Sequence, residues 1–196
     1  VALTGSATGT TVNGIRTTPM NDILAAQNAN LFETAFGGLT SGAVSNSALL
    51  SSVVTGTSPF ASFRAGLTSS LSQQLHMVAR LVNAQSTLGL KRQVFFVRTG
   101  GFDLHDNQVT AGATTSGAHA TLLRDISRSL SAFDNALTSI NAQNQVTTFT
   151  ASDFGRTYNT NGDGSDHGWG SHHFMLGGAV KGGDVYGKMP TFAING

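Results

Sequence analysis

Gln93-Val-Phe-Phe-Val97 and Val146-Thr-Thr-Phe-Thr150 are two short apolar runs on either side of one long helical pattern. Each run is typical of a strand that is buried on both faces. Between them, residues 116–140 place apolar side chains along one helical face, at Leu122, Leu123, Ile126, Leu130, Phe133, Leu137 and Ile140. Strand, helix and strand form a βαβ unit, in which the two strands are parallel and the crossover is right-handed. The sequence therefore predicts an α/β fold.

Two further helices are predicted upstream of these strands. After a short strand and loop over residues 1–18, Thr18-Pro19 has the signature of a helix start and predicts a helix over 21–36 that Gly37-Gly38 ends. Residues 37–58 show no clear period and are expected to form a surface loop. Ser58-Pro59 repeats the start signature, and helical spacing then continues almost to Gly89. Downstream, residues 175–180 are another candidate strand.

Composition limits the classes of function. Charged residues make up 11% of the chain and the formal net charge is +1, which gives little support to nucleic-acid binding. Cysteine is absent, so a disulfide, a thiolate nucleophile and a Cys-based zinc site are excluded. No apolar run is long enough to span a membrane. Abundant Ser, Thr, Asn and Gly with few Lys favour a periplasmic or extracellular protein. No signal peptide is visible at Val1, so we expect it to have been removed or to lie upstream.

Chemistry-bearing residues gather in two loops, 101–107 and 152–173, which contain four of the six histidines. Each loop follows the carboxyl end of a predicted strand, where open α/β sheets place their sites. Imidazole and carboxylate together are ligands for zinc, manganese or iron, whereas carboxylates alone suit calcium or magnesium. We predict a divalent metal, zinc or manganese with calcium as the alternative, and these candidate ligands: Asp103, His105, Asp153, Asp166, His167 and His172.

Simpler interpretations stay open for several of these residues. Asp103 could cap the turn that follows it, and Asp153 could cap a helix that begins near Phe154. Neighbouring side chains alternate along an extended backbone, so at most one residue of the pair His172-His173 is expected to reach a shared site. Arg156 is a candidate catalytic residue whose guanidinium could form bidentate hydrogen bonds with phosphate or sulfate oxygens. Its alternative role is an ion pair with Asp153.

Residues 94–108, 150–157 and 164–170 resemble the hallmark segments of the bacterial sulfatase-like family catalogued as domain of unknown function 1501. The segment 177–187 is similar to that family too. The resemblance is close over residues 94–187, which would form the metal-site core. Residues 1–93 fit the variable helical and loop region of the family more loosely, and the length of the chain suggests one domain in all.

The resemblance implies an alkaline-phosphatase-like fold, with a central, mostly parallel sheet flanked by helices and two metal positions above the strand ends. Asp103 and His105 correspond to an Asp and a His that hold one metal, and His167 or His172 corresponds to a later His. Asp153 corresponds to the Asp of an Asp-His pair at the second metal, but the residue after it is Phe154. This departure weakens the prediction of a complete second site.

The function implied is hydrolysis of small phosphate or sulfate esters by a protein exported through a twin-arginine signal. The nucleophile of the superfamily follows its first strand, and nothing in residues 1–60 matches that motif. We therefore expect the chain to be a partial domain whose partner is the remainder of its own polypeptide, with the nucleophile upstream of Val1. The alternatives are a secreted binding or surface-assembly protein that keeps the fold without catalysis, and a purely structural metal site.

Overall fold

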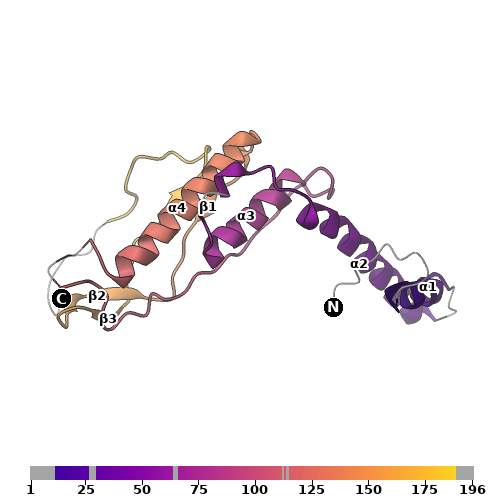
Figure 1. Ribbon diagram of the computed structural model, residues 1–196, viewed down its shortest axis with the longest axis horizontal. Helices are drawn as coiled ribbons and strands as arrows, with labels where there is room; N and C mark the ends of the chain where they lie inside the picture. Colours follow the sequence, from indigo (N-terminus) through magenta and orange to yellow (C-terminus); the bar gives the residue numbers. More distant parts are fainter. Residues whose placement is uncertain (1–11, 27–29, 64–65, 112, 114, 189–196) are drawn as a thin grey trace. The chain divides into compact units, whose positions relative to one another are not determined.

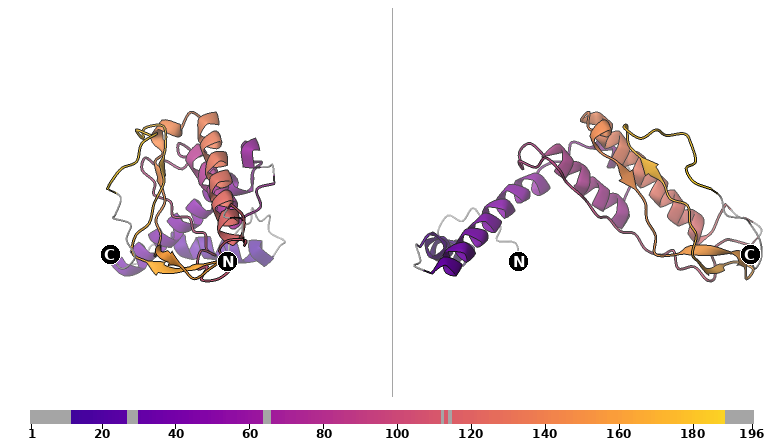
Figure 2. Two further views of the ribbon diagram at one scale, coloured as in Figure 1. Left: turned by 90° about the vertical axis from the view of Figure 1, so that its left-hand side faces the viewer. Right: turned by 180° about the vertical axis from the view of Figure 1, so that it is seen from behind.

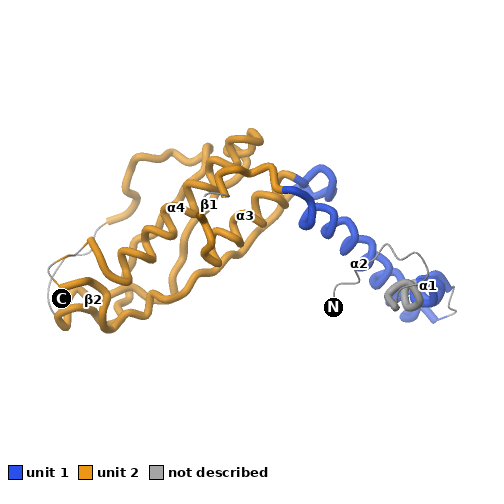
Figure 3. Tube along the Cα trace, viewed as in Figure 1, with its two compact units in different colours: residues 1–57, 84–91 blue, residues 58–83, 92–196 orange. Residues whose placement is uncertain are grey.

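The computed structural model describes residues 12–26, 30–63, 66–111, 113 and 115–188, with side chains from Thr18 onward. The chain divides into two compact units (Figure 3). Unit 1 consists of Val1–Thr57 and Ala84–Lys91, and unit 2 consists of Ser58–Asn83 and Arg92–Gly196. None of the helices in the described part of the chain is long and apolar enough to cross a lipid bilayer.

The described residues of unit 1 form the helices α1 (Val12–Ala25) and α2 (Leu31–Thr55). The helix α2 begins at the N-cap Asn30, whose side chain accepts a hydrogen bond of 2.9 Å from the backbone N–H of Phe32. A Cβ atom added at Gly37 would lie 3.5 Å from the carbonyl oxygen of Leu24, so α1 and α2 approach closely at this glycine. No residue of α2, all of which is described, is buried.

The expected boundaries in this region are wrong in two respects. Residues 37–58 do not form a loop, because α2 continues through Gly37-Gly38 to Thr55. Each glycine costs a helix only about 1 kcal/mol, so Gly37-Gly38 does not by itself end the helix. Thr18 is not an N-cap, since Pro19 lies inside α1. Of the strand and loop expected over 1–18, residues 1–11 lie outside the described part, and the rest belongs to α1.

The core of unit 2 is the interface between α3 (Ser70–Asn83) and α4 (Ala118–Ser139), which lie side by side with the short helix η1 (Ala61–Phe63) against them (Figures 1 and 2). Its buried apolar residues are Phe60, Phe63, Leu71, Leu75, Val78, Ala79, Val82, Ala132, Phe133, Ala136, Leu137 and Ala142. The helix predicted over 116–140 is confirmed as α4. The helix predicted from Ser58 is shorter, because Ser69 provides the cap: its Oγ accepts the N–H of Ser72 at 3.1 Å.

The strands of unit 2 form two antiparallel pairs. The strand β1 (Thr148–Phe149) pairs with β4 (Met175–Leu176), and β2 (Gly155–Thr160) pairs with β3 (Ser165–Gly168). The predicted strands over 146–150 and 175–180 are thus confirmed in short form. The fold is a mixture of helices and strands, as expected, but the described strands contain no parallel pair.

Residues 93–97 belong to none of the described strands, so the structure does not show the predicted parallel pairing with 146–150. At the end of this segment, the side-chain amide of Gln74 donates to the carbonyl of Arg98 at 2.8 Å and accepts its N–H at 3.0 Å. One side chain therefore satisfies both backbone hydrogen-bonding groups of Arg98. Val94 and Phe96 are left 98% and 89% exposed.

Candidate metal centre

Asp103, His105 and His167 bring three donor atoms together. Oδ1 of Asp103 lies 3.0 Å from Nε2 of His105 and 2.7 Å from Nε2 of His167. The three donor atoms lie within 4.8 Å of one another. In a tetrahedral zinc site with bonds of about 2.0–2.1 Å, neighbouring donor atoms are about 3.3 Å apart. The cluster therefore has the composition and nearly the spacing of a metal site.

The contacts within the cluster favour the ionised form of the Asp103 carboxyl. The hydrogen bond with His167 lowers the pKa of the Asp103 carboxyl, against a smaller opposing effect of desolvation, and the charges of His105, His167 and Arg156 lower it further. An ionised carboxylate oxygen can face two imidazole nitrogens at these distances only when a proton or a metal ion lies between each pair. The side chains of Asp103, His105 and His167 are 66%, 51% and 45% exposed, so an ion could reach them from solvent.

The turn between β2 and β3 holds the loop that carries Asp103 and His105. Asp163 accepts the backbone N–H of Asn107 at 3.0 Å through Oδ2, and the side-chain amide of Asn161 donates to the carbonyl of His105 at 2.7 Å. At Gly164 the two backbones approach so closely that a Cβ atom would lie 2.1 Å from the carbonyl oxygen of His105. These contacts place His167, on β3, against a loop about 60 residues earlier in the chain.

The rings of the cluster belong to a stack of planar groups. Phe154 lies parallel to His167, with ring centroids 3.9 Å apart and planes at 8°. The ring of His105 also stacks on His167, with ring centroids 4.8 Å apart and an angle of 28° between the planes. The guanidinium carbon of Arg156 lies 5.1 Å from the centroid of Phe154. The stacked ring of Phe154 therefore fixes the orientation of the His167 ring.

The guanidinium of Arg156 connects β3 with the loop that carries Asp103 and His105. Its Nη1 group donates to the carbonyl of Ser165, and its Nη2 group donates to the carbonyl of Phe102. In the described structure these carbonyls, rather than the carboxylate of Asp153, are the hydrogen-bond partners of the guanidinium. The charge of Arg156 is near enough to lower the pKa of Asp103. Its predicted contact with phosphate or sulfate oxygens stays a prediction.

Of the six predicted ligands, the structure brings three to one point and leaves three outside it. Asp166 contacts the far side of the His105 ring, with its Oδ1 3.2 Å from Nδ1. Asp153 and His172 are exposed and lie outside the group of converging donors. The neighbouring ring of His173 points to Thr150, whose Oγ1 lies 3.3 Å from Nδ1. A second metal position stays a prediction.

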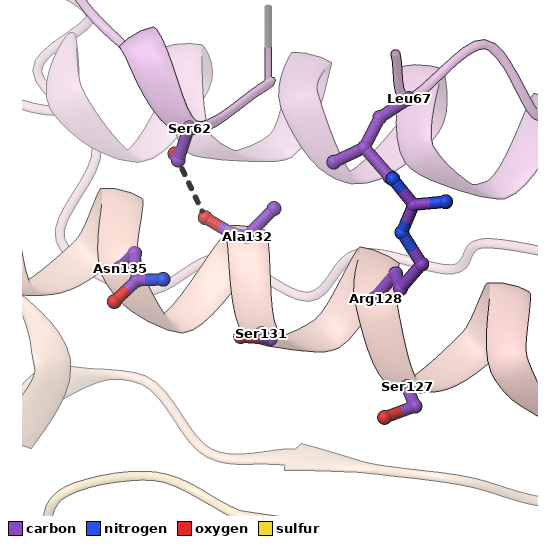
Figure 4. A pocket seen from close by; sticks show the side chains of 7 residues that line it. All are labelled: Ser62, Leu67, Ser127, Arg128, Ser131, Ala132 and Asn135. Atoms are coloured by element: carbon purple, nitrogen blue, oxygen red, sulfur yellow. Dashed lines mark hydrogen bonds between the residues drawn. The ribbon is translucent and has the colours of Figure 1, made fainter. Parts of the chain in front are cut away.

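A separate hollow of about 410 Å³ lies between η1 and α4 (Figure 4). Its floor is the polar face of α4, and across it Ser62 donates to the carbonyl of Ala132 at 3.1 Å. The lining residues are Ser62, Leu67, Ser127, Arg128, Ser131, Ala132 and Asn135. None of them is a donor of the Asp-His-His cluster, so the hollow is not part of the metal centre.

The fold and the site together define a protein of mixed helices and short strands with one exposed Asp-His-His cluster between two loops. The chain belongs to the family described as "Protein of unknown function (DUF1501)", which matches residues 20–195. This match covers α2, the core of unit 2 and every residue of the Asp-His-His cluster. No curated protein and no solved structure shows a significant match to the chain.

Proposed function

We propose that Asp103, His105 and His167 bind one divalent transition-metal ion, and that this ion is the centre of a hydrolase for phosphate or sulfate esters. The observation that supports the proposal is the convergence of one carboxylate oxygen and two imidazole Nε2 atoms, each within 4.8 Å of the others. Catalytic zinc sites use three protein ligands of this kind and keep a further position open for water or substrate.

The kinds of donor atom in the cluster favour some metal ions over others. Two imidazoles and one carboxylate suit zinc, manganese or iron, whereas calcium and magnesium prefer a shell of oxygens. Three ligands from the protein leave the remaining positions of the ion open to solvent, which fits the exposure of the cluster. We propose zinc or manganese, with calcium as the weaker candidate.

Each residue of the site has a task in this proposal. Asp103, His105 and His167 bind the ion, and Phe154 holds the plane of the His167 ring. Arg156 joins the two loops and adds a fixed positive charge beside the site, which favours an anionic ester. When bound, the ion supplies Lewis-acid polarisation of an ester oxygen. The proposal assigns no nucleophile within residues 12–188.

We extend the proposal to the larger architecture: an alkaline-phosphatase-like parallel sheet in a protein of the periplasm or cell exterior. Val94 and Phe96, two residues apart and so on one face of a strand, are 98% and 89% exposed, whereas Val97, on the other face, packs against the core. Apolar side chains on both faces are typical of a strand inside a parallel sheet, so the uncovered face supports the extension. An experimental structure of the natural polypeptide that contains this chain tests it. Residues 93–97 should lie beside 146–150 in a parallel sheet, and an unpaired segment would contradict the extension.

A second candidate is a non-catalytic metal site that fastens the two loops of a secreted binding or surface-assembly protein. The observation that favours it is the openness of the cluster, whose side chains are 45–66% exposed. Catalytic sites are more often concave and shielded from water.

Metal analysis and turnover assays separate the two candidates. We expect the natural polypeptide that contains this chain to purify with a bound metal and to hydrolyse an aryl phosphate or an aryl sulfate. Asp103→Asn should abolish both properties, whereas Asp106→Asn, which removes the same charge three residues away, should keep them. Bound metal without turnover of either ester favours the non-catalytic site. Absence of bound metal, also after incubation with zinc or manganese, contradicts both candidates.

A further inference from the structure

The ring of His105 lies between two carboxylates, and each carboxylate contacts a different ring nitrogen. Nε2 lies 3.0 Å from Oδ1 of Asp103, and Nδ1 lies 3.2 Å from Oδ1 of Asp166. The two nitrogens of an imidazole point away from each other, so Asp166 is on the side of the ring opposite to the converging donors. Asp166 is accordingly absent from the group that could hold one ion.

The backbone explains why Asp166 and its neighbour His167 have different positions. Both belong to β3, where successive side chains point to opposite faces of the hairpin. His167 pairs in register with Arg156, and its ring stacks between Phe154 and His105. Asp166 instead reaches the outer edge of the His105 ring. Two adjacent residues of one strand thus approach the same imidazole from two directions.

We infer that Asp166 is a positioning residue, which accepts the Nδ1 proton of His105 and so leaves the lone pair of Nε2 free for the metal ion. The inference rests on the proposed metal site. A neutral imidazole carries its proton on one nitrogen only, and the hydrogen bond at that nitrogen decides which one binds a metal. Metal-binding histidines commonly donate their other N–H to a carboxylate of this kind, which fixes the ring and increases its basicity. The sequence predicted Asp166 as a ligand. The geometry instead places Asp166 outside the group of donors, in contact with the ligand His105.

The inference predicts a graded series of substitutions. Asp166→Ala removes the acceptor and should weaken zinc binding by about 10–100-fold, the range typical of carboxylates in this position. Asp166→Asn keeps a weaker, neutral acceptor and should have an intermediate effect, while Asp166→Glu should restore much of the affinity. Asp106→Asn is the matched control, because it removes a negative charge next to His105 from a side chain that makes no contact with the ring.

Long-range ¹H–¹⁵N correlation of the imidazoles in the zinc-loaded chain, with zinc titrations of each variant, tests the inference. We expect His105 to carry its proton on Nδ1 and zinc on Nε2, and the Nδ1 proton signal to shift or broaden in Asp166→Ala. Zinc bound through Nδ1, or an affinity in Asp166→Ala equal to that of Asp106→Asn, overturns the inference while the metal site stands. An Nδ1 proton signal that does not respond to Asp166→Ala overturns it as well. If the unaltered chain binds no zinc, the proposed function itself fails.

Discussion

The α3–α4 core and the metal centre belong to the same unit but are held together by different forces. In the core, Phe133 and Ala136 are 2% and 1% exposed, and apolar burial supplies the stability. In the metal centre, the side chains of Asp103 and His105 are more than half exposed, and hydrogen bonds and ring stacking set the geometry. Because the two regions share few groups, the site can be damaged without unfolding the core.

The largest effect is expected in the core. Phe133→Ala removes a fully buried ring and should lower the free energy of unfolding by about 3–5 kcal/mol. Urea denaturation followed by circular dichroism measures the change. Leu123→Ala, on the same helix but 43% exposed, should cost much less. Equal losses for the two variants would contradict the assigned core.

Gly164→Ala should damage the site more than the core. The new Cβ atom would lie 2.1 Å from the carbonyl oxygen of His105, so the hairpin must move away from the loop at a cost of about 1–3 kcal/mol. Zinc affinity should fall while the helical signal is retained. Gly170→Ala is the control, because its Cβ atom meets nothing within 4 Å. Unchanged zinc binding in Gly164→Ala would show that the hairpin does not position the donors.

A smaller effect is expected when the stacked ring next to His167 is removed. An aromatic pair contributes about 0.5–1.5 kcal/mol beyond its buried area, so Phe154→Leu should weaken zinc binding by up to about tenfold. Calorimetric titration of zinc into the variant measures this loss. Phe174→Leu, which replaces an exposed phenylalanine that does not stack on either histidine of the site, should leave the affinity unchanged. A similar loss in both variants would argue against a specific role for the stack.

The smallest effect concerns His119, near the N-terminal end of α4. Partial burial lowers the pKa of this imidazole, and the charge of Arg156 lowers it further. Since the folded-state pKa lies below the unfolded value of about 6.5, acidification protonates the unfolded chain first. The stability that His119 contributes is therefore present at neutral pH and is lost as the pH falls below 6.5. His119→Gln should make the decline in stability of the metal-free chain between pH 7 and pH 5 shallower. Superimposable curves for the two proteins would refute this.

Sequence patterns predicted the parts of the molecule that depend on local periodicity. The apolar stripe of 116–140 predicted α4 to within two residues, because a helix that packs on one face must repeat its apolar positions. The helix α2 could not be predicted in the same way. It buries no residue, so no buried apolar stripe marks its length, and the cap at Asn30 marks only its first residue. Local glycine and hydroxyl content suggested a loop instead.

The candidate site shows the same limit. The residue types and their placement after predicted strands named Asp103, His105 and His167 among the candidate ligands, and the structure brings these three together. The outward position of Asp166 and the stacking of Phe154 on His167 follow from the antiparallel register of β2 and β3, in which Arg156 faces His167. The sequence was interpreted as strands joined through a helix, and that topology contains no such hairpin. Pairing between strands is a long-range property that a local pattern does not encode.

The most direct test of the account is a calorimetric titration of zinc into the 196-residue chain and into its Asp103→Asn, His167→Ala and Asp106→Asn variants. The account predicts one tightly bound ion per chain, lost or strongly weakened in the first two variants and retained in the third. At a free zinc concentration 100 times the dissociation constant, binding should also stabilise the fold by about 2.7 kcal/mol. Absence of binding by the unaltered chain, or equal binding by all three variants, would contradict the assignment of Asp103, His105 and His167 as a metal centre.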